Sequence, residues 1–590
     1  FLTPENIYIS LLTSDFDESQ AADSAPSLEP WFNAEYRILP IEPNTLASWK
    51  QIEYSRFKFL YMPRRNDFIP QDLTMKRGAG VEAPQASPKK ILDNAACRLW
   101  YFPDYNFKRP KVNAVFYLWL PNALKVYGKA ASTVYLELYV ELTKMLLTPF
   151  AYFADIAGLD FAVEARGGGI QVIFRGFNDK AVVLAEQVIG TLRDVAIGGN
   201  TNEEYFAIIK ESLRRKYLNA TIKPQKQASA ARLSMLLAYR VHPREAAEAL
   251  EQTTIELFES YASLMYRVAF YEGLVSGNMT EAEALDLFTV LTKTLTFPTT
   301  TPMSNALEPE FRIVDLERKA PSVGETVSFL YEEESDNTRE KNTAIEVYFQ
   351  MDFCNNSWEE SITCSRLLSS LISEKFFDIL RTKEQLGYNV DCDNLWSADV
   401  VGFNFRIKSP TKPGKHLEDR IESFINRIGQ YLKIVPEDHY KKTRESLAKL
   451  RLLPDDSLWE QTMRIWRQIL DRKYAWNATE LEAAAIRKTE LPTVFKWYKN
   501  HFLKHRKKLC VIVNPGIPGT DLEEVRSGEE SESSEVSEGS QEGDDESSDV
   551  AVPETGLYED AFWWKKCSTL VNVENIQTLH LQQGVHRACQ

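Results

Sequence analysis

Two stretches of this chain that lie roughly 230 residues apart resemble each other in sequence. Thr201-Asn-Glu-Glu-Tyr205 matches Val435-Pro-Glu-Asp-His-Tyr440, and Lys210-Glu-Ser-Leu213 matches Arg444-Glu-Ser-Leu447. In both places the matching residues belong to helical patterns that follow strands, a long helix and a strand pair in the same order. The fold class that this repeat predicts is α+β, with two tandem homologous domains in which an antiparallel-rich sheet packs with helices.

The hydrophobic pattern places the same kinds of element in each copy. The first copy is predicted to contain helices over 130–147, 180–193, 202–218 and 281–293, and strands over 112–120, 161–164, 170–175 and 267–276. The second is predicted to contain helices over 357–380, 416–434 and 436–452, and strands over 326–331, 343–350, 388–392 and 401–408. Arg166-Gly-Gly-Gly169 predicts a hairpin turn, because it lacks the spacing and the following helix of a phosphate loop.

Changes in composition divide the chain into four segments. Residues 89–305 and 306–590 are expected to hold the two homologous domains. Residues 46–88 are rich in proline, aromatic and basic residues, which predicts an extended linker. Residues 1–45 are expected to be the terminal piece of a further, upstream domain of the same kind.

The expectation for residues 1–45 rests on one strand-like pattern near the start of the chain. Ile7, Ile9 and Leu11 alternate with polar residues, and a lone strand cannot bury a face by itself. The chain also begins at Phe1 without a methionine or a signal-peptide pattern. We therefore expect Phe1 to be a cut edge.

Composition argues against several classes of protein. With 590 residues the chain is too long for one core, and its 44% hydrophobic residues are ample for packed interiors. No apolar run approaches the roughly 18–20 residues that a membrane span needs, so no membrane partner is expected. The seven cysteines include no Cys-x-x-Cys pair, which argues against a thiolate zinc site and predicts a cytoplasmic or other reducing compartment.

The net charge of −15 is concentrated in one tract. Residues 521–549 hold thirteen acidic residues against the single Arg526, so the remainder of the chain is almost neutral. No basic field is left for nucleic acid. The tract lacks aromatic residues and is rich in serine and glycine, so residues 521–550 are expected to be a disordered acidic insertion in the second domain.

A helix meets a strand pair around Arg381-Thr-Lys-Glu-Gln-Leu-Gly-Tyr388. The helix is predicted by apolar residues at three- and four-residue steps: Trp358, Ile362, Leu367, Leu368, Leu371, Ile372, Phe376, Phe377 and Leu380. Gly387 offers a left-handed or otherwise unusual backbone step where that helix has to stop. Arg381 and Tyr388 thus stand at a junction from which side chains can project into a neighbouring cleft. Local sequence alone favours a half-buried strand residue for Tyr388 and a solvated helix-end cation for Arg381.

This motif resembles the non-catalytic C-terminal half of insulin-degrading-enzyme-like zinc metallopeptidases, the pitrilysin and insulysin family of inverted zincins. Further segments carry the resemblance in the same order along nearly the whole chain: Phe68-Ile-Pro70, Arg98-Leu-Trp-Tyr101, Val134-Tyr-Leu-Glu-Leu138, Gly176-Phe-Asn-Asp-Lys180, Gly277-Asn278 and Phe403-Asn-Phe-Arg-Ile-Lys408. The resemblance implies that Tyr388 stabilises the substrate oxyanion in trans and that Arg381 binds the substrate and transition state. It further implies that Gly387 sets the backbone that aims Tyr388.

The same resemblance implies a zinc site on a His-x-x-Glu-His helix. The equivalent helices here, predicted over 130–147 and 357–380, contain no histidine, so both domains are expected to be inactive peptidase-like copies. Only His501 and His505 have the four-residue separation of the motif, and Lys504 stands where the base belongs. We expect a basic helix end there, no metal bound by this chain, and zinc bound by an N-terminal half.

Two functions from different classes follow. In the first, the chain is the non-catalytic half of a zinc metalloendopeptidase that encloses and degrades peptides, and it is inactive alone. Its partners would be the N-terminal catalytic half, in the same polypeptide or as a separate chain, peptide substrates, and a second copy if a homodimer forms. The alternative is a stand-alone pseudopeptidase that serves as a scaffold or partner subunit of a processing-peptidase-like assembly.

Overall fold

The computed structural model describes residues 3–12, 26–51, 65–76, 87–121, 126–198, 202–237, 240–298, 300–302, 315–316, 327–353, 358–397, 400–516 and 568–569. The chain divides into two compact units, residues 1–67 and 68–590. The acidic insertion expected over 521–550 lies outside the described residues. Within the described ranges, no helix combines the length and the apolar character needed to cross a membrane.

The first unit contains only short elements. These are η1 (Pro4–Asn6), the antiparallel pair β1 (Ser27–Leu28) and β2 (Glu35–Tyr36), and α1 (Pro43–Lys50). Residues 7–12 form no strand, and Ile9 and Leu11 are exposed, so the strand predicted there is wrong for the described residues. An extended segment without a neighbouring strand has no partner for its backbone groups.

The first sheet of the second unit is mixed and seven-stranded. Its strands are β3 (Lys89–Asp93), β4 (Cys97–Pro103), β5 (Lys111–Trp119), β6 (Leu159–Arg166), β7 (Gly169–Phe177), β8 (Val268–Gly277) and β9 (Thr301–Pro302). They lie in the order β3-β4-β8-β5-β7-β6, with β9 beside β8. Between β6 and β7, Gly167 and Gly168 both have positive φ, which confirms the predicted hairpin turn.

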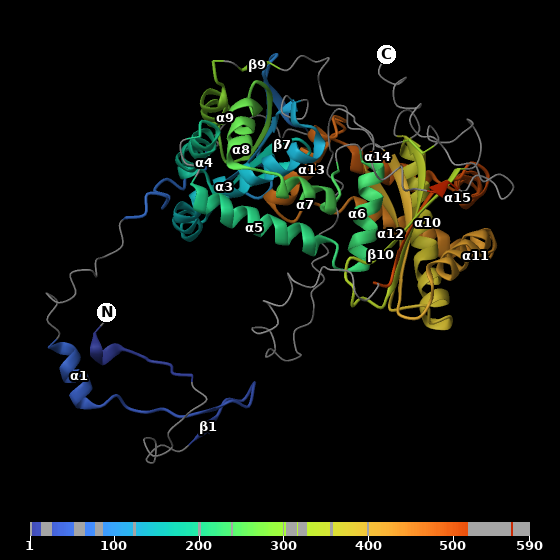
Figure 1. The fold of residues 1–590 in the computed structure, drawn as a ribbon, viewed down its shortest axis with the longest axis horizontal. Helices are drawn as coiled ribbons and strands as arrows, with labels where there is room; N and C mark the ends of the chain where they lie inside the picture. Colours follow the sequence, from blue (N-terminus) through green and yellow to red (C-terminus); the bar gives the residue numbers. More distant parts are fainter. Residues whose placement is uncertain are drawn as a thin grey trace. The chain divides into compact units, whose positions relative to one another are not determined.

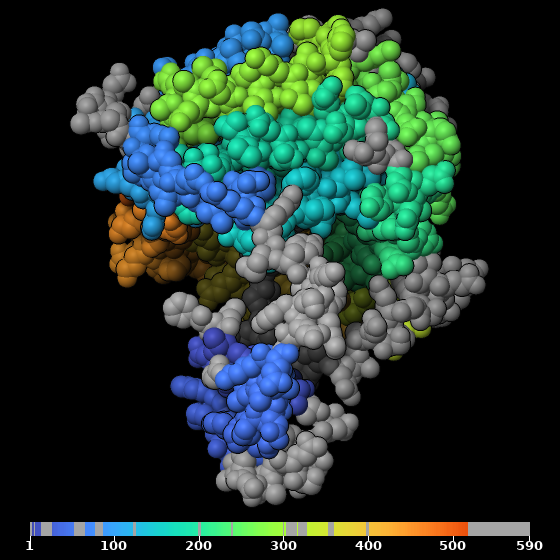
Figure 2. Space-filling model, turned by 90° about the vertical axis from the view of Figure 1, so that its left-hand side faces the viewer, coloured from blue at the N-terminus to red at the C-terminus, as the bar shows by residue number. Residues whose placement is uncertain are grey.

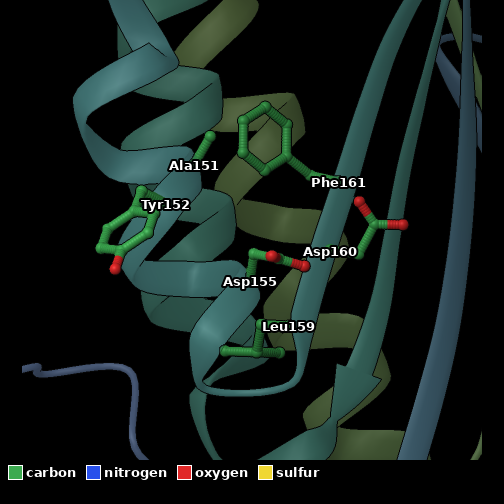
Figure 3. Close-up of a pocket in the computed structure, with 6 residues that line it drawn as sticks. All are labelled: Ala151, Tyr152, Asp155, Leu159, Asp160 and Phe161. Atoms are coloured by element: carbon green, nitrogen blue, oxygen red, sulfur yellow. The ribbon is translucent and has the colours of Figure 1, made fainter. Parts of the chain in front are cut away.

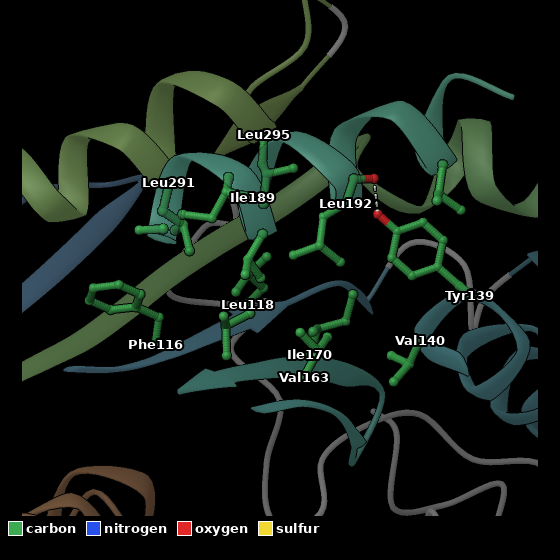
Figure 4. Close-up of a cluster of buried hydrophobic side chains, with 14 of the residues drawn as sticks. Phe116, Leu118, Tyr139, Val140, Val163, Ile170, Ile189, Leu192, Leu291 and Leu295 are labelled. Atoms are coloured by element: carbon green, nitrogen blue, oxygen red, sulfur yellow. Dashed lines mark hydrogen bonds between the residues drawn. The ribbon is translucent and has the colours of Figure 1, made fainter. Parts of the chain in front are cut away.

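Helices cover one face of this sheet. They are α3 (Lys129–Ile156), α4 (Ala181–Ala196), α5 (Glu203–Ala220), α7 (Pro243–Glu251), α8 (Ile255–Met265) and α9 (Glu281–Leu295). Phe116 and Leu118 of β5 pack with Ile189 and Leu291 in the core between the layers (Figure 4). In Figure 2 the teal to yellow-green side chains of these helices form a closed outer layer.

α3 is longer than the sequence predicted. The predicted helix stops at residue 147, whereas the observed helix continues to Ile156 with Pro149 inside it. Proline removes one helical hydrogen bond, but it does not end a helix that neighbouring elements hold in place. Leu147 and Ala154, on either side of Pro149, are both buried in the core.

The second sheet repeats this arrangement. Its strands, in spatial order, are β12 (Asn389–Ser397), β13 (Val400–Ser409), β11 (Thr343–Phe353), β14 (Lys507–Asn514), β10 (Val327–Glu334) and β15 (Ser568–Thr569). The helices that pack with it include α10 (Trp358–Phe377), α11 (Gly414–Lys433), α12 (Glu437–Arg451), α14 (Ala478–Lys488) and α15 (Leu491–Tyr498). The α+β fold class is confirmed.

Each sheet receives on its opposite face a helix from the other half of the unit. α6 (Pro224–Leu236) packs against β11 and β14, and α13 (Leu458–Leu470) packs against β5 and β8 (Figure 1). The alternation of side chains along β5 explains why the opposite face of the sheet has to be covered. Phe116 faces α3 and its neighbours, whereas Val115 and Tyr117 face Trp466 of α13. Both sheets are thus buried on two faces.

Candidate functional site

The motif that carries Arg381 and Tyr388 begins where α10 widens into the π-helical turn η7 (Asp378–Lys383). The backbone N–H of Glu384 donates to the carbonyl of Ile379 at 2.9 Å, and that of Leu386 donates to Leu380 at 3.0 Å. Leu380 and Leu386 are buried, so they anchor the turn in the core of the second domain. Single π-turns inside helices occur frequently at functional sites.

Two residues of the turn have special backbone requirements. The left-handed residue is Gln385, with φ of 52°, and not Gly387 as the sequence suggested. Gly387 is needed for space, because a Cβ atom there would lie 1.8 Å from the carbonyl oxygen of Lys408. The expectation of a left-handed step was thus placed two residues too late. The turn lies directly against β13, so Gly387 allows the close approach from which Tyr388 departs.

Arg381 lies close to two aromatic rings. Its guanidinium carbon lies 4.6 Å from the ring centre of Phe377 and 4.5 Å from that of Tyr388. Tyr388 is 78% exposed, so the half-buried strand position that local sequence favours is wrong. A cation–π contact attracts the charge to the ring without a hydrogen-bond acceptor, and the guanidinium carries five N–H donors in its plane. Within the described residues those donors have no hydrogen-bond acceptor, and they are available to carbonyl oxygens.

Glu384 connects the turn to α11. Arg420 donates from Nε to one Glu384 carboxylate oxygen at 2.7 Å and from Nη2 to the other at 2.6 Å. The hydrogen bond to Glu384 raises the pKa of Arg420 above its ordinary value. Lys383 and Asp378 form a second ion pair, at 2.6 Å, within the turn itself. The sequence left the role of Glu384 open, and the structure gives it a structural partner.

The two histidines with metal-like spacing do not converge. His501 is buried in η8 (Lys499–Lys504) with its ring centre 4.8 Å from that of Trp497, whereas His505 is exposed just beyond this turn. The helical end predicted here is confirmed. Among the described residues no group of three or more histidine, cysteine or acidic side chains could hold a metal. These residues do not fit the zinc site of the resembled family.

A pocket of about 330 Å³ lies elsewhere, between the end of α3 and the start of β6. Figure 3 shows Asp155 and Asp160 on its two sides, with Phe161 and the exposed Tyr152 at its edges. Asp160 already accepts a hydrogen bond from Arg175 at 2.9 Å. The pocket contains none of the predicted site residues, which belong to the second sheet and its helices.

Sequence reasoning missed two neighbours of the site. Phe377 was assigned to the buried face of the helix, but it is 39% exposed and stacks on Arg381. Phe377 is the last residue of α10 and follows the buried Phe376, and residues one position apart on a helix do not share a face. Arg420 was missed because its partner lies 36 residues away in sequence and only tertiary structure brings them together.

Comparison with known proteins places this geometry in a family. Residues 1–249 match the family model described as the middle or third domain of peptidase M16. Residues 367–466, which include Arg381, Gly387, Tyr388 and Arg420, match the C-terminal lobe domain 4 of PqqF-like PQQ synthase. The chain resembles peptidases of the M16 family over these two segments. The predicted resemblance is confirmed.

Curated relatives of this chain are longer proteins. It is 27% identical to a nardilysin-like protein of Arabidopsis thaliana, over 86% of this chain and 48% of the relative. It is 29% identical to human nardilysin, over 86% of this chain and 42% of the relative. It is 27% identical to bovine insulin-degrading enzyme, over 84% of this chain and 46% of the relative. The chain spans about half the length of the curated relatives that it matches.

Solved structures share the fold of this chain. The crystal structure of pitrilysin superposes with a TM-score of 0.68 at 19% identity, over 84% of this chain and 50% of that chain. A structure described as a peptidase M16 inactive domain from Pseudomonas fluorescens superposes with a TM-score of 0.52 at 12% identity, over 72% of this chain and 98% of that chain. At these identities the likeness shows the fold alone.

Proposed function

We propose that this chain is the non-catalytic half of a zinc metalloendopeptidase that encloses and degrades peptides. The observation that carries the proposal is the pair of half-buried Arg381 and exposed Tyr388 at the end of a π-turn, where the Arg381 N–H groups have no acceptor among the described residues. The match to an M16 family model and the match to about half of longer relatives, among them nardilysin and insulin-degrading enzyme, support the proposal.

Each residue has a distinct role in this proposal. Tyr388 donates its phenolic hydrogen to the oxyanion that develops on the scissile carbonyl, a donor worth about 3–4 kcal/mol at the transition state. Arg381 holds carbonyl oxygens of the substrate backbone with its in-plane N–H groups. The zinc ion that activates water would belong to the N-terminal half. The chain alone contributes binding and charge stabilisation, and it is inactive.

The test replaces the phenol in the assembled enzyme. The chain is joined to a zinc-bearing M16 half, as one polypeptide or as two chains, and hydrolysis of a fluorogenic peptide is measured. Tyr388→Phe should lower kcat about a hundredfold or more, because it removes one oxyanion donor. Tyr152→Phe is the matched control, since Tyr152 is also well exposed, at 66%, but lies at the pocket of the first sheet.

Two results would decide against this function. If Tyr388→Phe and Tyr152→Phe both retain full turnover, the exposed phenol has no part in catalysis. If the chain on its own forms a stable complex with a peptidase that needs neither Arg381 nor Tyr388, the scaffold role of a pseudopeptidase is the better account. The inactive-domain structure from Pseudomonas fluorescens, which shares the fold, keeps that alternative in view.

A further inference from the structure

The turn that presents Tyr388 has few restraints of its own. Its two backbone hydrogen bonds, from Glu384 and Leu386, both return to η7, and the ion pair between Lys383 and Asp378 also stays inside it. Gln385 is in the left-handed region, so the helical hydrogen bonding ends there, and the pairing of β12 with β13 begins only at Asn389. The direction of the exposed side chains therefore depends on contacts with other elements.

One side-chain contact connects the turn to another element. Arg420 projects from α11 and binds both carboxylate oxygens of Glu384, at 2.7 and 2.6 Å. Within the described residues, it is the ion pair that joins residues 378–388 to another element. Glu384 lies between Arg381 and Tyr388 in sequence, so the pair acts in the middle of the presented segment. Two parallel hydrogen bonds from a planar guanidinium fix the carboxylate in orientation as well as in position.

We propose that Arg420 is a positioning residue for the oxyanion site. It does not touch the substrate; it holds Glu384 and thereby fixes the turn on which Arg381 and Tyr388 stand. The buried Leu380 and Leu386 keep the turn attached to the core. Loss of Arg420 should therefore let the turn change its orientation without unfolding the domain. The inference rests on the proposed function for its consequence in catalysis, but the positioning itself can be measured on the chain alone.

The first measurement is hydrogen–deuterium exchange of the chain at neutral pH, followed by mass spectrometry of peptides. Arg420→Ala should speed exchange over residues 384–390 about tenfold, while α10 and β13 keep their protection. Arg487→Ala is the matched control, because Arg487 also binds both oxygens of one glutamate, Glu445, at 3.1 Å each, between two helices away from the turn. It should leave exchange over 384–390 unchanged.

Rescue separates positioning from general stability. Arg420→Lys keeps the charge but loses the two parallel N–H donors of the guanidinium, and should show an intermediate rate of hydrogen exchange. The exchanged pair Glu384→Arg with Arg420→Glu should restore protection close to that of the unaltered chain. In the assembled enzyme, kcat should fall about tenfold for Arg420→Ala and return for the exchanged pair, with the melting temperature of each variant measured alongside.

The outcomes divide cleanly. Unchanged exchange over 384–390 in Arg420→Ala overturns the inference, and so does faster exchange that spreads over the whole second domain, since that is a loss of stability. The inference is supported if hydrogen exchange rises only over residues 384–390 in Arg420→Ala and protection returns in the double variant Glu384→Arg with Arg420→Glu. If turnover of the assembled enzyme is unchanged in Tyr388→Phe, the proposed function fails. The exchange result for Arg420 stands in that case, because it is measured on the chain alone.

Discussion

Arg381 combines two uses of one side chain. The rings of Phe377 and Tyr388 both lie near its guanidinium, and each such cation–π contact at an exposed site contributes roughly 0.5–1 kcal/mol. The donors around its edge are left available. An arginine that paired with a carboxylate instead would be equally ordered but would have no donors to offer. The aromatic stack thus orders the group without consuming its hydrogen bonds.

A prediction about stability concerns a single residue, Gly387. Gly387→Ala should destabilise the chain by about 1–3 kcal/mol, because the new Cβ would overlap the carbonyl of Lys408, a backbone group that cannot move aside. Denaturant unfolding of the chain measures the change. Gly190→Ala in α4 is the control: nothing lies within 4 Å of its added Cβ, so stability should hold or rise. Equal stability of the two variants would contradict the close approach.

Among elements, α11 is held to β14 by a buried charge cluster. Lys508 donates to Glu418 at 2.5 Å and to Glu422 at 2.7 Å. Burial raises the pKa of Glu418, but the charge and hydrogen bonds of Lys508 outweigh burial and hold the pKa below its ordinary value. The same holds for Glu422, where Arg506 adds to the effect of Lys508.

A pH dependence follows from these lowered carboxylate pKa values. Their contribution to stability is fully present above the ordinary glutamate pKa of about 4.3 and is lost as the pH falls through the lowered folded values. Glu418→Gln should therefore destabilise the chain at pH 7, and its difference from the unaltered chain should shrink near pH 3. Unfolding by urea at both pH values checks this, with the exposed Glu186→Gln as control. A difference that is constant with pH would contradict the assignment.

The sequence pattern predicts elements well where one face is apolar and the other polar. α4, α5, α9 and α11 lie within a few residues of their expected bounds for this reason. α6 was not predicted: its buried residues include Ala228 and Ala231, small side chains that leave little apolar signal. α13 was missed although Leu458, Ile465 and Ile469 recur at helical spacing; the sequence does not indicate that this face packs against the sheet of the other domain.

The candidate site was only partly predictable. The motif from Arg381 to Tyr388 and its place after a long helix follow from sequence. The exposure of Tyr388, the stacking of Phe377 and the link from Arg420 do not, because each depends on how η7 turns and on where α11 packs against it. Patterns of hydrophobicity report which face of an element is buried, but they do not report how a polar turn is held.

At the scale of the whole second unit, charged pairs fasten the halves where α6 crosses to the second sheet. Arg232 of α6 donates to Glu346 of β11 at 2.7 Å, and both side chains are almost fully buried. Asn404 of β13 also donates to Glu346, at 3.4 Å. Removal of either charge would leave the other inside the protein without a counter-charge.

Arg232→Met should therefore destabilise the second unit by about 3–5 kcal/mol, since Glu346 would stay buried and unpaired. Arg232→Met combined with Glu346→Leu should recover much of that loss, because both charges are then gone. Lys441→Met is the surface control: its pair with Glu437 is exposed to solvent and contributes little to stability. Chemical denaturation of the four proteins measures these differences, and equal losses for Arg232→Met and Lys441→Met would contradict the expectation.

The reciprocal placement of α6 and α13 has a consequence for how such a chain can be divided. A cut between the two sheets would strip each fragment of the helix that shields its inner face, and would leave Tyr117 on one side and Tyr348 on the other facing water. Neither repeat is then a self-sufficient module, although each has its own sheet and helices. Because each half supplies the helix that covers the other's sheet, we expect residues 68–590 to unfold as one cooperative body.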